Sequence, residues 1–139
     1  MKVHEYQARD LLTLFKIPVC LGEGISSAAE AGAVFSHVAN PRAVAKVQVL
    51  MGGRGKAGGV KLVHTAAEAK IFCEQFIGKP FSTTQSAGES KIVRKILIAE
   101  SIAVRSEFYL GVVVDRPAGA PVVLFSKEGG VEIEEDAAK

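Results

Sequence analysis

The stretch from 52 to 61 reads Gly-Gly-Arg-Gly-Lys-Ala-Gly-Gly-Val-Lys, and it decides how the rest of the chain is interpreted. Residues 53–58 have the glycine spacing of a dinucleotide-binding turn, but that turn needs a helix beginning at its third glycine. Here an extended segment follows at 60–63, and the next helix cap comes only at Thr65. The pattern is therefore strand, glycine loop, strand.

A P-loop is excluded on similar grounds. Leu50 stands where a P-loop has its first glycine, and Ala57 stands where it has Ser or Thr. A glycine hairpin can instead fold over a triphosphate, with its backbone N–H groups toward the oxygens and with Arg54 and Lys56 adding charge. These two cations repel each other until an anion arrives, so we expect the loop from 51 to 59 to be mobile without a nucleotide.

Lys46 lies in the β-like segment 43–49 that leads into this loop. Alternation along a strand places Ala45, Val47 and Val49 on one face and Val44, Lys46 and Gln48 on the other. A lysine in the middle of such a strand is well placed to contact phosphates. The alternative is a lysine on an edge strand that points to water beside a mobile hairpin tip, and spacing alone leaves both interpretations open.

The remaining segments predict an α+β fold with a mixed, largely antiparallel sheet and flanking helices. Ser27 with Glu30, and Thr65 with Glu68, have the spacing of capping boxes. Helices are expected at 5–15, from the Ser27 cap up to Asn40-Pro41, and at 66–77, and further strands at 60–63, 92–99, 107–115, 122–126 and 131–133.

Two carboxylates flank the reversal between two of these strands. Glu100 directly follows the apolar segment 96–99, and Glu107 opens the next strand. Backbone groups at such a reversal could meet an adenine edge, while the carboxylates accept hydrogen bonds from ribose hydroxyls. The alternative is that both are solvated acids at strand ends.

Composition limits the possible classes of protein. The chain has 139 residues, 48% hydrophobic and 23% charged, with a net charge of +2, which favours one globular domain and no nucleic-acid or membrane partner. Cys20 and Cys73 are far apart and are expected to be small buried hydrophobic residues of a cytoplasmic protein. No His, Cys or Ser is paired with a base, so any covalent chemistry is expected to lie elsewhere.

Several motifs, in order, carry a resemblance to a known family. They are His4-Glu5-Tyr6-Gln7-Ala8, Lys46-Val47-Gln48, the glycine stretch 52–61, Tyr109-Leu110-Gly111 with Val114-Asp115-Arg116, and 128–134 (Glu-Gly-Gly-Val-Glu-Ile-Glu). Together they resemble the N-terminal part of the β subunits of the ADP-forming succinate–CoA ligases (succinyl-CoA synthetases), which are ATP-grasp proteins. The similarity covers essentially the whole chain.

The resemblance implies that succinate, CoA and ATP are converted reversibly to succinyl-CoA, ADP and phosphate, a step of the tricarboxylic acid cycle. Phosphate would pass through a phosphohistidine of a partner α subunit. The positions that match the family's nucleotide-binding residues are Lys46, Gly53, Arg54 and Gly55 for phosphate, Glu107 for ribose, and Glu100 with Ile102 at the adenine hinge. Glu100 lies one residue closer to Glu107 than in bacterial members, so the register of the hinge is open by one position.

The same resemblance implies a partial ATP-grasp domain over 1–139. Residues 21–102 would form the smaller nucleotide-lid subdomain, and 1–20 with 103–139 would begin the larger one. The Mg²⁺ ligands and the C-terminal CoA-ligase domain would lie beyond position 139, so the fragment alone is expected to be inactive. Malate–CoA ligase and ATP-citrate lyase share the glycine loop, and a non-catalytic nucleotide-binding or interaction module is the other alternative.

Overall fold

The computed structural model describes residues 2–127 and 129 and divides the chain into two compact units, Met1–Ile102 and Ala103–Lys139. The assignment of 21–102 and of 1–20 with 103–139 to two ATP-grasp subdomains stays a prediction.

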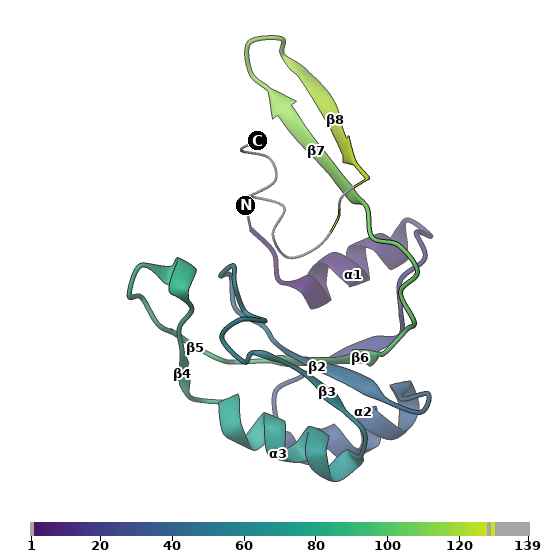
Figure 1. The fold of residues 1–139 in the computed structure, drawn as a ribbon, viewed down its shortest axis with the longest axis vertical. Coiled ribbons are helices and arrows are strands. Elements are labelled where there is room, and N and C mark those ends of the chain that lie inside the picture. Colours follow the sequence, from purple (N-terminus) through teal and green to yellow (C-terminus); the bar gives the residue numbers. More distant parts are fainter. Residues whose placement is uncertain (1, 128, 130–139) are drawn as a thin grey trace. The chain divides into compact units, whose positions relative to one another are not determined.

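The first unit is built on a four-stranded antiparallel sheet. Its strands, in spatial order, are β1 (Gly22–Ile25), β6 (Ile96–Glu100), β2 (Ala43–Val47) and β3 (Val60–Val63) (Figure 1). In the register of the two central strands, Lys46 lies opposite Leu97 and Val44 lies opposite Ala99. These four side chains therefore share one face of the sheet, which we call the open face.

The opposite face of the sheet carries the hydrophobic core. The helices α2 (Ala31–Val38) and α3 (Ala66–Phe76) cover it, as Figure 1 shows. Burial alternates along β2, with Ala45 and Val47 fully buried and Lys46 partly exposed, as the sequence pattern predicts. The 3₁₀ turn η1 (Ala28–Glu30) precedes α2.

Both predicted helix caps are confirmed. The backbone N–H of Ser27 donates to Glu30 Oε1 at 2.8 Å, and the backbone N–H of Glu68 donates to Thr65 Oγ1 at 3.1 Å. Cys73 is fully buried in the core, and burial, followed by the nearby charges of Glu30 and Glu74, raises the pKa of its thiol to about 11. Cys20 is only half-buried, so the prediction of a buried residue is wrong there.

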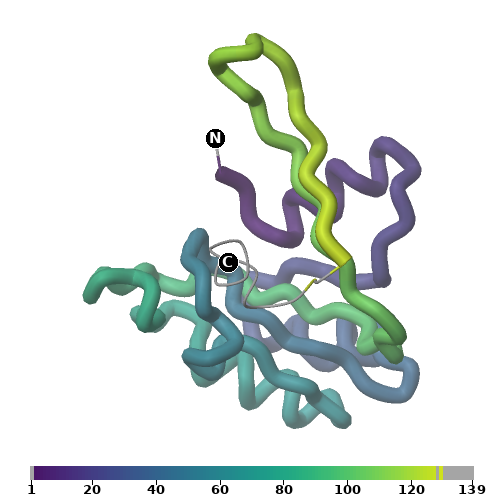
Figure 2. Tube along the Cα trace, turned by 45° about the horizontal axis from the view of Figure 1, so that its top comes forward, coloured from purple at the N-terminus to yellow at the C-terminus, as the bar shows by residue number. Residues whose placement is uncertain are grey.

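The first helix, α1 (Glu5–Leu14), lies on the open face, over β1 (Figures 1 and 2). Its approach depends on a glycine, because a Cβ atom at Gly24 would lie 3.1 Å from Cγ of the Tyr6 ring. The helix buries none of its own residues within the described part of the chain, and Leu11 on its apolar side is half-exposed.

The predicted strand 92–99 is in fact two strands with different partners. β5 (Lys91–Ile92) pairs with β4 (Pro80–Phe81), and the turn η2 (Thr84–Ser86) lies between them. The chain then changes neighbours: Val93 N–H donates to Lys79 O at 3.0 Å, whereas β6 pairs with β1 and β2. Neither β1 nor β4 was predicted, because each is short and begins with Gly or Pro.

The second unit is a β-hairpin of β7 (Tyr109–Asp115) and β8 (Ala120–Ser126). Leu110 lies opposite Phe125 and Val112 opposite Val123, and all four side chains are exposed. The strand predicted at 107 begins two residues later because Glu107 and Phe108 do not pair with β8. The strand predicted at 131–133 lies outside the described residues.

The predicted fold class is confirmed. The strand pairs that the structure describes are antiparallel, and helices lie on both faces of the larger sheet. Among residues 2–127 and 129, no helix has the length and apolar character to cross a bilayer.

Candidate functional site

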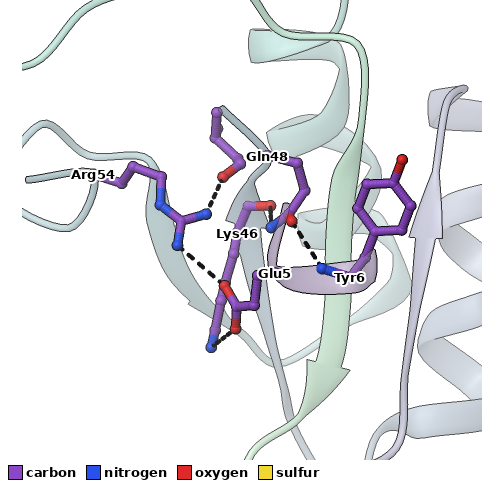
Figure 3. A network of polar contacts seen from close by, with 6 residues as sticks. Glu5, Tyr6, Lys46, Gln48 and Arg54 are labelled. Atoms are coloured by element: carbon purple, nitrogen blue, oxygen red, sulfur yellow. Dashed lines mark hydrogen bonds and ion pairs between the residues drawn. The ribbon is translucent and has the colours of Figure 1, made fainter. Parts of the chain in front are cut away.

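One carboxylate joins the two basic residues at the root of the glycine loop. Lys46 Nζ lies 2.8 Å from Glu5 Oε1, and Arg54 Nη2 lies 3.1 Å from Glu5 Oε2 (Figure 3). The three side chains are 30, 29 and 24% exposed for Lys46, Glu5 and Arg54. The site is thus partly shielded from water yet accessible to a ligand.

Three separate segments supply this cluster. Lys46 comes from the open face of β2, Arg54 from the glycine loop, and Glu5 from the first residue of α1. The helix start is closed by Gln7, whose Oε1 accepts the backbone N–H of His4 at 2.9 Å. A carboxylate at the start of a helix is further stabilised by the helix dipole.

The side chain of Gln48 connects the start of α1 to the end of β2 through two hydrogen bonds. Its side chain is only 3% exposed. Its Oε1 accepts the backbone N–H of Tyr6 at 3.2 Å, and its Nε2 donates to Lys46 O at 3.2 Å (Figure 3). A buried amide with both ends bonded fixes the backbone on either side of the Glu5–Lys46 pair.

The glycine loop is a series of tight turns joined by backbone hydrogen bonds within the loop. Gly59 N–H donates to Arg54 O at 2.8 Å, and Ala57 N–H donates to Gly53 O at 3.2 Å. Gly53 has φ +71°, a left-handed conformation that glycine adopts without strain. Arg54 Nη1 donates to Val47 O at 2.8 Å, so this guanidinium anchors the loop to the strand before it.

The electrostatics of the cluster favour an additional anion. Burial raises the pKa of Glu5, but the hydrogen bond and charge of Lys46 and then those of Arg54 outweigh it, so the pKa lies below its ordinary value of 4.5. Glu5 is therefore ionised at neutral pH, and its single negative charge leaves the two cations with a surplus of +1. Within the described residues, Lys46 donates one of its three N–H groups to Glu5.

An open pocket of about 390 Å³ lies beside the cluster. Glu5 and Arg54 line it together with Lys2 and with Val49 to Gly52 at the start of the glycine loop. Lys2 and Arg54 against Glu5 make its wall positive overall. Such a pocket, with N–H donors and excess positive charge, suits phosphate groups.

The structure brings four of the predicted site residues together within the first unit. Lys46, Gly53, Arg54 and Gly55 lie at one place. Glu100 ends β6, where its backbone N–H donates to Leu21 O at 2.8 Å, and Ile102 is half-exposed at the end of the first unit. Glu107 is exposed and belongs to the second unit.

Glu5 and Gln48 are the site residues that sequence reasoning did not assign. Glu5 entered only as part of the N-terminal motif, and Gln48 only as a neighbour of Lys46 on one strand face. We expected the charge of Arg54 to be unbalanced until an external anion binds. That expectation is corrected, because Arg54 already pairs with Glu5. The pairing joins residues 49 positions apart, which no local pattern shows.

Comparison with known proteins assigns the family. A model of the ATP-grasp domain matches residues 2–139. The chain belongs to the ATP-grasp family. Within it, the chain is 42% identical over 137 residues to the protein named succinate–CoA ligase [ADP-forming] subunit beta of Exiguobacterium sibiricum. That match covers 99% of this chain and 36% of the relative's length, so the chain spans about a third of it.

Solved structures confirm the ATP-grasp fold. ATP citrate lyase from Methanothrix soehngenii, in complex with citrate and coenzyme A, gives a TM-score of 0.70 at 22% identity, over 93% of this chain and 32% of that one. The dinucleotide-forming acetyl-coenzyme A synthetase 1 of Ca. Korarchaeum cryptofilum, in complex with coenzyme A, Ca-AMPCP and HgCl⁺, gives a TM-score of 0.67 at 20% identity. The match covers 89% of this chain and 52% of that one.

Proposed function

We propose that this ATP-grasp chain forms the nucleotide-binding part of an ADP-forming succinate–CoA ligase. The complete enzyme would convert succinate, CoA and ATP to succinyl-CoA, ADP and phosphate. One observation carries the proposal: Lys46 and Arg54 lie together at the root of the glycine loop, beside a positive pocket. The identity of 42% to the β subunit of such a ligase over this whole segment supports the choice of reaction.

The cation cluster would bind the phosphates of the nucleotide. Lys46 and Arg54 would donate charge-assisted hydrogen bonds, and backbone N–H groups of Gly53 and Gly55 would add to them. The backbone around Glu100 and Ile102 would meet the adenine, and Glu107 would accept from the ribose hydroxyls. The alternative is that this chain is the equivalent part of a related ligase, which has the same nucleotide site but uses malate or citrate in place of succinate.

A partner and a metal complete the proposal. An α subunit would carry the phosphohistidine. Mg²⁺ would accompany the nucleotide, but residues 2–127 and 129 hold no cluster of three or more His, Cys, Asp or Glu side chains suited to a metal ion. We therefore assign no step to Mg²⁺ at these residues. The cytoplasmic location stays a prediction.

The test is nucleotide binding followed by turnover. The protein produced from its natural gene is titrated with ADP and with ATP by calorimetry, and is then assayed with the α subunit encoded by the same genome for ATP-dependent thioester formation from CoA and succinate, malate or citrate. We expect binding of the nucleotide and thioester formation with succinate. A folded protein that binds neither nucleotide and leaves the α subunit inactive would instead be a non-catalytic interaction module.

A further inference from the structure

We propose that Glu5 is a positioning residue that holds Lys46 and Arg54 side by side so that both can bind one polyphosphate. The inference rests on the proposed function only for the identity of the polyphosphate, a nucleotide. Glu5 lies outside the strand and loop that supply the two cations, and it approaches them from α1.

Glu5 divides its carboxylate between the two cations. Each oxygen of Glu5 serves a different cation, Oε1 at 2.8 Å from Lys46 Nζ and Oε2 at 3.1 Å from Arg54 Nη2. Two positive side chains held against one carboxylate repel each other, and in a partly buried site this repulsion is weakly screened. The shared anion offsets it and keeps the two groups within reach of a single ligand.

Glu5 itself is held in place by its neighbours. Its neighbour Tyr6 is bound through its backbone to the buried Gln48, and the Tyr6 ring packs on Gly24 of β1. Glu5 therefore does not swing freely as a surface carboxylate would. A rigid partner lowers the entropy that Lys46 and Arg54 lose when a ligand binds, which is the usual benefit of preorganisation.

Glu5 leaves hydrogen-bond donors and space for the ligand. Lys46 uses one of its three N–H donors on Glu5, and Arg54 uses one of its five on Glu5 and one on Val47 O. The remaining donors are enough for a phosphate to bind without displacing the carboxylate. The adjoining pocket provides the space.

The experiment compares Glu5→Gln with Glu23→Gln in the protein produced from its natural gene. Glu23 is a matched control, because it lies on β1 and pairs with His37 of α2 at 2.6 Å, on the opposite face of the sheet. Calorimetry with ADP and with inorganic tripolyphosphate gives Kd and stoichiometry. We expect Glu5→Gln to raise both Kd values about tenfold, because one of the two cations is then no longer held within hydrogen-bond reach of the polyphosphate, and Glu23→Gln to change neither.

A double-mutant cycle separates positioning from a loss of folded protein. In a Lys46→Met background, Glu5→Gln should raise Kd less than it does in the wild type, because one of its two partners is gone. Misfolding would lower the stoichiometry and leave Kd unchanged. An unchanged or lower Kd in Glu5→Gln overturns the proposal, the lower value meaning that Glu5 competes with phosphate.

The two probes also distinguish this proposal from the proposed function. If the wild type binds tripolyphosphate but no nucleotide, and Glu5→Gln weakens that binding, then positioning stands and the nucleotide function fails. If the wild type binds ADP and Glu5→Gln has no effect, the function stands and positioning fails. If it binds neither probe, both are overturned.

Discussion

The buried side chain of Gln48 accepts a hydrogen bond from the backbone N–H of Tyr6, which is 42 positions away in the chain. This bond, 3.2 Å long, ties α1 to the end of the strand that carries Lys46. The geometry of the cation cluster therefore depends on Gln48, an uncharged residue that bonds to the backbone of Lys46 rather than to its ammonium group.

Replacing Gln48 by Ala should destabilise the first unit. The change leaves Tyr6 N–H and Lys46 O without their partner, and an unsatisfied buried polar group costs about 1–3 kcal/mol. Urea unfolding of the two proteins measures the loss. Gln75→Ala is the control, since Gln75 is exposed on α3; an equal loss in both variants would contradict the role of Gln48.

The stabilisation contributed by Glu5 should disappear in acid. Its pKa is lower when folded than its ordinary value of 4.5, chiefly because Lys46 and then Arg54 outweigh the effect of burial. The ionised group thus stabilises the fold above pH 4.5, and this contribution is lost as the pH falls through the folded-state pKa. The difference in unfolding free energy between the wild type and Glu5→Gln, measured at a series of pH values, should shrink below pH 4.5. Gln75→Ala, which removes an exposed uncharged side chain of α3, should show no such trend.

Lys46→Ala should weaken nucleotide binding and leave the fold intact. Losing a charge-assisted contact to phosphate costs about 1.5–3 kcal/mol, which is roughly ten- to a hundredfold in Kd. Calorimetry with ADP checks the affinity and thermal unfolding checks the fold. Lys70→Ala removes an exposed lysine of α3 and should bind as the wild type does. An unchanged Kd for Lys46→Ala would refute the assignment.

Gly24→Val should displace α1 and perturb the cluster. Even a Cβ atom would lie 3.1 Å from the Tyr6 ring, and the branched side chain adds further overlap. We expect a loss of about 1–3 kcal/mol in unfolding free energy. Gly32→Ala should instead raise the free energy of unfolding. The new Cβ atom would lie 3.9 Å from its nearest neighbour, and alanine favours the helix by about 0.5–1 kcal/mol over glycine.

Nucleotide should slow hydrogen exchange in the glycine loop. Without ligand the loop is closed mainly by its own turns and by Arg54, so its amides are expected to open easily. Phosphate oxygens would accept from these N–H groups and protect them. Exchange measured with and without ADP over residues 51–59 tests this, with the amides of β2 as the reference; equal protection in both states would favour a rigid structural hairpin.

The sequence by itself determined the local features of this protein. Alternation along β2 placed Lys46 opposite the core, and the spacing of Ser27 and Thr65 to their glutamates placed two helix starts. The glycines of the loop, followed by an extended segment, excluded a dinucleotide turn. These features depend on residues a few positions apart, so a short stretch of sequence is enough to specify them.

Only the tertiary structure decided which distant groups meet. It made Gly22–Ile25 an outer strand, divided the predicted strand 92–99 between two partners, and brought Glu5 between Lys46 and Arg54. A carboxylate at a helix start has the same local pattern whether it faces water or a lysine, and only the packing of α1 on β1, with Gln48 holding it, distinguishes the two. The placement of Lys46 and Arg54 at the root of the glycine loop could therefore be predicted from sequence, whereas the carboxylate that joins them could not.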